Sequence, residues 1–181
     1  RRRKSRFGSS PLKDMFLVKT TKSKLEKIIL EDKGQTIDGW SHDDIVSINA
    51  KQQLGENDIQ WNLDMLDTPD LDGYYTYQYN GTGIDTYIID TGILDTHEEF
   101  ENRAKSYSIN NIDTIDCNGH GTHVSSIVGG KTYGVAKRAN IISVKALDCN
   151  GTGKVSDIIK AIYWSVNKNK NKRGILSISL G

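Results

Sequence analysis

The chain has 181 residues, of which 36% are hydrophobic and 26% are charged, so it is long enough to bury a core that does not depend on disulfides. Its 24 Lys and Arg residues against 23 Asp and Glu give a net charge of +1, which offers no electrostatic basis for binding nucleic acid or a membrane surface. No apolar run reaches the ~18 residues of a membrane span, and no signal peptide is visible. The only two cysteines, Cys117 and Cys149, do not by themselves define a redox compartment.

The first part of the chain, up to about residue 47, is polar and differs in character from the rest. Residues 1–10 lack any pattern and are expected to be disordered. Apolar residues at helical spacing predict a helix over Thr21–Ile29, and a short apolar run predicts a strand over Ile45–Ile48. We expect a small α+β element with a thin core and no catalytic residues.

A short acidic stretch with Pro69 and Gly73 comes after Trp61, and it contains Asp64, Asp67, Asp70 and Asp72. In a loop, carboxylates at such close spacing can supply the oxygen ligands of a hard cation such as Ca²⁺. The same composition is also typical of a solvated turn, and the local sequence leaves both interpretations open.

From residue 84 onward, predicted strands and helices alternate. The strands are apolar runs and the helices carry apolar residues at i, i+3 and i+4. This order implies right-handed crossovers, and therefore an α/β fold with a parallel sheet and helices on both faces. The predicted elements are a strand at Ile84–Asp90, a helix starting at His120, a strand at Ile141–Leu147, a helix at Val155–Lys168 and a strand at Gly174–Leu180.

Asp90 and His120 are the candidate catalytic pair. Functional groups gather beyond the carboxyl ends of the strands in such sheets, where Asp90 ends one strand and His120 opens a helix. A buried carboxylate can hold an imidazole in one tautomer, and the imidazole can then take a proton from a weak nucleophile. Gly119 and Gly121 flank the histidine, and we interpret them as allowing close backbone approach to a substrate.

Two alternatives use the same residues. His120 and His123, three positions apart, could bind a metal if Asp90 and Glu98 completed the site, although this spacing matches no strong metal pattern. Asp90-Thr91-Gly92 also has the form of an aspartic protease active strand, whose chemistry needs two carboxylates. Because no second Asp-Thr-Gly exists in the chain, that alternative requires a homodimer and leaves the histidine motif unexplained.

Several motifs in order resemble the subtilisin-like serine proteases (subtilases), in particular the branch around proteinase K and aqualysin. The aspartate precedes the histidine, as in that family. The resemblance covers roughly residues 48–181. The motifs are YIIDTGILDTHEEF (87–100), DCNGHGTHVSSIVGGKTYGVAK (116–137), VKALDCNGTG (144–153) and SISLG (177–181).

The resemblance implies a doubly wound parallel sheet and a serine endopeptidase with an Asp-His-Ser triad, in which Asp90 is the triad aspartate, His120 the general base and His123 structural. It implies no cofactor for catalysis, a structural calcium on Asp64, Asp67 and Asp72, and a disulfide between Cys117 and Cys149. A peptide or protein substrate would bind as an added strand between two edges. These edges are Gly151-Thr152-Gly153 and Ser179-Leu180-Gly181.

The resemblance also implies a secreted protein. The disulfide favours an oxidising, secretory setting, and the sequons at Asn80 and Asn150 are compatible with glycosylation there. Residues 1–49 resemble the end of an inhibitory propeptide that is cleaved near Asn49–Ala50, and residues 50–181 resemble the N-terminal part of the catalytic domain, without its C-terminal half.

The family's nucleophilic serine lies in a Gly-Thr-Ser motif that these 181 residues do not contain, and Ser177 and Ser179 belong to the substrate edge instead. We therefore expect the 181-residue chain to be inactive by itself. Two hypotheses remain: the sequence is part of a longer endopeptidase, or it is an inactive fragment or non-enzymatic remnant.

Overall fold

The computed structural model describes residues 18–32, 45–47, 61–67, 74–110, 113–169 and 173–181. The chain divides into two compact units, Arg1–Asp44 and Ile45–Gly181. In the described part of the first unit, helix α1 (Lys22–Asp32) has no buried side chain. Residues 1–10 and the expected junction at Asn49–Ala50 lie outside the described residues.

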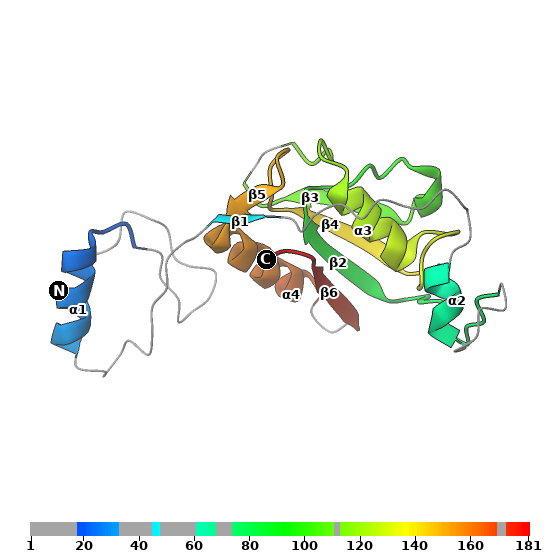
Figure 1. The fold of residues 1–181 in the computed structure, drawn as a ribbon, viewed down its shortest axis with the longest axis horizontal. Helices are drawn as coiled ribbons and strands as arrows, with labels where there is room; N and C mark the ends of the chain where they lie inside the picture. The colour runs from blue at the N-terminus through cyan, green and yellow to red at the C-terminus, as the bar shows by residue number, and fades with distance from the viewer. Residues whose placement is uncertain (1–17, 33–44, 48–60, 68–73, 111–112, 170–172) are drawn as a thin grey trace. The chain divides into compact units, whose positions relative to one another are not determined.

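The second unit is built on a parallel sheet of four strands in the order β3-β4-β2-β6 (Figure 1). Strand β2 lies between two neighbours, and its residues from Thr86 to Asp90 are all buried. Its register pairs Asp90 with Lys145 at the carboxyl end of β4. The strands are β2 (Asp85–Asp90), β3 (Ala104–Ser108), β4 (Asn140–Lys145) and β6 (Gly174–Ile178).

Helices cover both faces of this sheet, as the sequence predicts. Successive strand residues point to opposite faces, so Ile88 and Ile89 enter different cores. Ile88 packs with Ile141, Phe100 and the partly buried residues of α3 (His120–Gly129). Ile89 packs with Val144 and the apolar stripe of α4 (Val155–Lys168). The α/β fold with a parallel sheet between helices is confirmed.

Four short elements are not expected from the sequence: α2 (Trp61–Asp67), the 3₁₀ helix η1 (Glu98–Phe100), strand β3 and strand β5 (Thr152–Lys154). The expectation of a loop at the acidic stretch is therefore wrong at its start, because Asp64 and Asp67 lie in α2. Strand β5 pairs antiparallel with β1 (Ile45–Ser47). Among the described helices, none has both the length and the apolar character needed to cross a membrane.

Candidate active site

The carboxylate of Asp90 and the imidazole of His120 are in direct contact. Asp90 closes β2, His120 opens α3, and the Nδ1 atom of His120 lies 2.8 and 2.9 Å from the two Asp90 carboxylate oxygens. The Asp90 side chain is fully buried, whereas the His120 side chain retains 12% exposure. With Nδ1–H donating to Asp90, the neutral imidazole carries its lone pair on Nε2, the arrangement of a general base.

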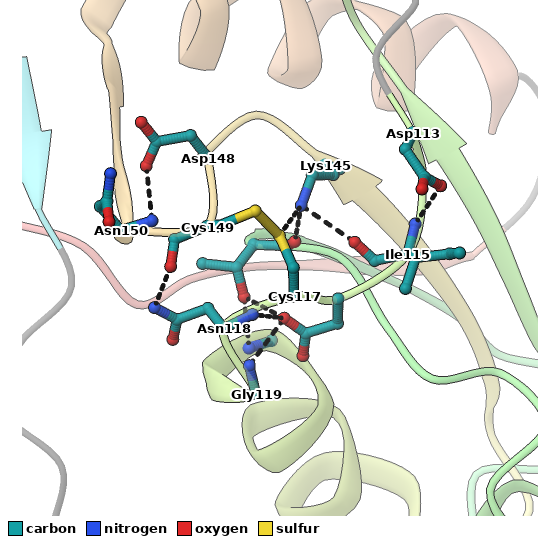
Figure 2. The surroundings of a disulfide bond; sticks show 12 residues. Asp113, Ile115, Cys117, Asn118, Gly119, Lys145, Asp148, Cys149 and Asn150 are labelled. Carbon is teal, nitrogen blue, oxygen red and sulfur yellow. Dashed lines mark hydrogen bonds between the residues drawn. A yellow bond between two sulfur atoms is a disulfide. The ribbon is translucent and has the colours of Figure 1, made fainter.

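Thr91 and Lys145 hold the turn that follows Asp90. The Thr91 amide donates to Asp90 Oδ1 over 2.7 Å. Lys145 is only 3% exposed, and its Nζ donates to the carbonyl oxygens of Thr91 and Ile115 and lies 3.6 Å from Cys117 Sγ (Figure 2). The Lys145 side chain thus joins the Asp90 turn to the loop that leads into α3.

Asp116 is the second carboxylate of this region. Its oxygens accept hydrogen bonds from five donors: Thr91 Oγ1, the Thr122 hydroxyl, and the amides of Asn118, Gly119 and Thr122. Burial raises the pKa of Asp116, but the bonds from Thr122, Gly119 and Thr91 outweigh this effect and hold the pKa at about 2. The group is therefore a fixed anion at the start of α3, where the helix dipole favours negative charge.

Gly121 has a packing role that differs from the role expected from the sequence. A Cβ atom there would collide with the carbonyl oxygen of Gly92, so the first turn of α3 sits against the turn that follows Asp90. This packing requires a glycine at position 121, whereas the interpretation of Gly121 as a point of substrate approach stays a prediction. Gly119 takes a φ of 97° and has open space where its Cβ would be, so its absence of a side chain serves the turn into α3.

Cys117 and Cys149 form a disulfide, the pairing that the resemblance implies, with a Cα–Cα distance of 5.0 Å. The bond links the loop before α3 to the turn before β5 (Figure 2). Asn118 Nδ2 reinforces this link by donating to the Cys149 carbonyl over 2.9 Å. The turn itself is organised by Asp148, whose pKa is lowered by hydrogen bonds from the amides of Thr152 and Asn150.

The two expected substrate edges differ in their surroundings. Gly151 is buried at a φ of 74°, and Thr152 and Gly153 lie in β5, where β1 already occupies the edge as an antiparallel partner. In the register, Val46 is opposite Gly153 and Ser47 is opposite Thr152. The other edge comes after β6: Ser179 and Leu180 are half-buried, Leu180 packs against the core beneath α4, and Gly181 is exposed.

The residues that the sequence suggests as metal ligands receive no support from the described side chains. Asp64 is 4% exposed within α2, and Asp72 lies outside the described residues. Where the structure describes side chains, no group of three or more His, Cys, Asp or Glu could hold a metal ion. His123 is exposed on α3.

The two sequons differ in environment. The Asn80 side chain accepts hydrogen bonds from Thr82, at 3.1 Å from the amide and 2.7 Å from the hydroxyl. Asn150 is exposed beside the disulfide.

Sequence reasoning missed Thr91, Lys145 and Asp116 as parts of the site. The one local signal was Asp116, an aspartate close before a helix start, which is a capping pattern. The bonds to Thr91 and Lys145 join segments far apart in the chain, so no local pattern reports them.

The comparisons with known proteins agree with this geometry. Residues 81–181 match the sequence profile of the Subtilase family, Peptidase S8. An extracellular serine proteinase of Thermus sp. (strain Rt41A) is 42% identical over 151 residues, covering 76% of this chain and 35% of that protein. Subtilisin-like protease 7 of Trichophyton verrucosum is 44% identical over 144 residues, covering 75% of this chain and 35% of that protein.

The fold has solved counterparts as well. The crystal structure of a cold-adapted subtilisin-like serine proteinase aligns with a TM-score of 0.58 and 41% identity, over 65% of this chain and 44% of that one. The chain thus spans about a third of the length of the curated relatives it matches. From the matched family profile, the relatives and the shared fold, we conclude that this chain belongs to the subtilase family of serine peptidases.

Proposed function

We propose that the complete protein is a serine endopeptidase in which Asp90 orients His120 as the general base. The observation that carries this proposal is the contact of His120 Nδ1 with both oxygens of a fully buried carboxylate. Nε2 would take the proton of a serine hydroxyl as that oxygen attacks the peptide carbonyl, and would return it to the leaving amine. Water then hydrolyses the acyl-enzyme by the reverse proton path. The serine is the one in the family's Gly-Thr-Ser motif.

The same contact argues against the aspartic protease alternative. An aspartic dyad needs a second carboxylate close enough to share a proton with the first. Here both oxygens of Asp90 face the imidazole of His120, and the amide of Thr91 donates to one of them. These contacts support the proposed role of Asp90 as a triad aspartate.

The substrate would bind as an added strand along β5. The support for this mode is that β5 already accepts an extended segment, β1, as an antiparallel partner. Residues 1–49 would be a propeptide that blocks this edge until it is cleaved near Asn49–Ala50, which makes the precursor a zymogen. Export would suit the disulfide, and the Thermus relative is named extracellular. Glycosylation at Asn80 or Asn150, and a structural calcium at Asp64, Asp67 and Asp72, are predicted on the resemblance alone.

The test is a pair of histidine variants in the complete protease. His120→Ala should fold normally and reduce peptide hydrolysis by a factor of about 10⁴ or more, because the serine loses its base. His123→Ala is the matched control: in the described residues it removes an exposed imidazole three positions away on α3, and it should keep far more activity than His120→Ala. Hydrolysis of a chromogenic peptide and the far-ultraviolet circular dichroism of each variant supply the two readouts. Retained activity in His120→Ala would refute the proposed function.

A further inference from the structure

Thr91 is hydrogen-bonded to both segments that carry the candidate pair. It comes directly after Asp90 in the chain and is fully buried. Its amide donates to Asp90 Oδ1 over 2.7 Å, and its hydroxyl oxygen accepts the amide proton of Gly121, the residue after His120, over 3.0 Å. A single side chain therefore touches the backbone on the histidine side while its own backbone holds the aspartate.

The orientation of the Thr91 hydroxyl depends on Asp116. Thr91 Oγ1 donates to Asp116 Oδ1 over 2.8 Å. A carboxylate can only accept, so the hydroxyl proton must point at Asp116, and a lone pair is left for Gly121. The other four donors to Asp116 come from the helix entry, at Asn118, Gly119 and Thr122. The Asp116 carboxylate thus binds both the start of α3 and the turn that follows Asp90.

We propose that Asp116 is a positioning residue for the Asp90–His120 pair, acting through the hydroxyl of Thr91. Asp116 aligns Thr91 so that the turn after β2 and the first turn of α3 keep one relative placement, in which His120 Nδ1 meets both oxygens of Asp90. Loss of this alignment weakens the contact between imidazole and carboxylate without removing either group. The catalytic part of this inference rests on the proposed function, whereas the placement of the imidazole does not.

The competing interpretation is that Asp116 merely caps α3. A cap stabilises the helix through the amides of its first turn and needs no bond to another segment. Three features exceed that role: the bond from Thr91, the onward bond from Gly121 to Thr91, and the packing of Gly121 against Gly92 without room for a Cβ. A variant of Thr91 separates the two roles, because it leaves all four helix-entry donors to Asp116 in place.

Thr91→Val is the principal test, since valine keeps the shape and charge of threonine and removes only the hydroxyl. In the complete protease, the proton on His120 Nδ1 should give a low-field NMR signal that exchanges slowly with water. We expect Thr91→Val and Asp116→Asn both to move this signal upfield or to broaden it through faster exchange. Thr91→Ser, which restores the hydroxyl, should restore the signal.

Asp113→Asn is the matched control. It removes the same charge from the same loop, but Asp113 is exposed, and among the described residues its carboxylate accepts from the Ile115 amide over 2.9 Å. The signal should be unchanged in this variant. An unchanged signal in folded Thr91→Val and Asp116→Asn overturns the inference, as does an equal change in Asp113→Asn. If Thr91→Val does not fold, Asp116→Asn and Thr91→Ser decide by the same criteria.

In the complete protease, Thr91→Val should lower kcat by about 10- to 100-fold with little change in KM, because misplacement of the base affects the chemical step. A rise in KM with unchanged kcat contradicts the positioning role. Failure of the proposed function is seen separately, since it would show as retained hydrolysis in His120→Ala while the NMR changes in Thr91→Val persist.

Discussion

At the scale of single residues, the site depends on Lys145 and Asp116, two polar side chains that are held by several hydrogen bonds each. Lys145 is buried among carbonyl oxygens and a disulfide sulfur, and Asp116 is surrounded by hydroxyl and amide donors. The Asp116 pKa of about 2 arises because the donors stabilise the anion more than burial destabilises it. Both groups act on Thr91, the residue next to the candidate catalytic aspartate.

The low pKa of Asp116 predicts that the stability of the fold decreases in acid. The folded pKa of Asp116 lies below its ordinary value of 3.8, so the stabilisation is fully present above about pH 5 and is lost as the pH falls toward 2. Its size is on the order of 1–2 kcal/mol once screening by solvent is allowed for. Urea unfolding of the parent and of Asp116→Asn should therefore show a stability gap at pH 6 that narrows toward pH 2. A gap that stays constant with pH would show that the Asp116 charge has no part in stability.

The contrast between Asp90 and Asp116 shows which residues of the candidate site could be predicted from the sequence. The pairing of Asp90 with His120 could be predicted because each residue sits in a distinctive motif, at a strand end and at a helix start. The role of Asp116 could not, because its bond to Thr91 spans 25 positions and has no local signature. Such bonds form because tertiary packing brings distant segments together, and the apolar periodicity of a sequence does not predict which segments meet.

At the scale of elements, apolar periodicity is informative where one face is buried and uninformative where it is not. The stripe of α4 predicts Val155–Lys168, and the structure has the same bounds. Strand β3, with the sequence AKSYS, is polar and carries no strand pattern; its pairing with β4 makes it a strand. Strand β5 has only three residues and exists by virtue of β1. Tertiary partners, rather than propensity, define these two strands.

The disulfide is the element-scale feature with the clearest energetic consequence. It closes a loop with a sequence separation of 32, for which the chain-entropy treatment gives about 3–4 kcal/mol. The double variant Cys117→Ser, Cys149→Ser should lose about this amount in the free energy of unfolding, measured by urea denaturation. Parent protein with its disulfide reduced should unfold at the same urea concentration as the variant. Equal stability of oxidised parent and variant would contradict the prediction.

At the scale of the whole molecule, the described sheet brings Asp90 and His120 together at the carboxyl edge of its strands. The fold class and the Asp–His pair were predictable from motif order, because strands and helices alternate and the motifs fall where the strands end. The seating of β1 on β5 was not, since it joins residues about a hundred positions apart.

The residues present in the 181-residue chain also determine the reactivity that we expect of it. It offers His120 and Asp90 but no Gly-Thr-Ser motif. A fluorophosphonate probe, which labels activated serines, should therefore leave this chain unmodified, while the complete protease should be labelled stoichiometrically. Intact mass measurement distinguishes the two outcomes. Specific labelling of the 181-residue chain would mean that one of its own serines is activated.

The pairing of β1 with β5 has a consequence for the binding of other segments to the same strand edge. Because β1 belongs to the same chain as the edge it occupies, an incoming peptide would compete with it at an effective concentration, which is on the order of millimolar for linked binding segments in general. A peptide present at micromolar levels would rarely displace it. Cleavage of the chain after β1 would turn β1 into a ligand that can dissociate. The occupancy of the β5 edge would then fall with dilution, and it would fall furthest where the released segment diffuses away.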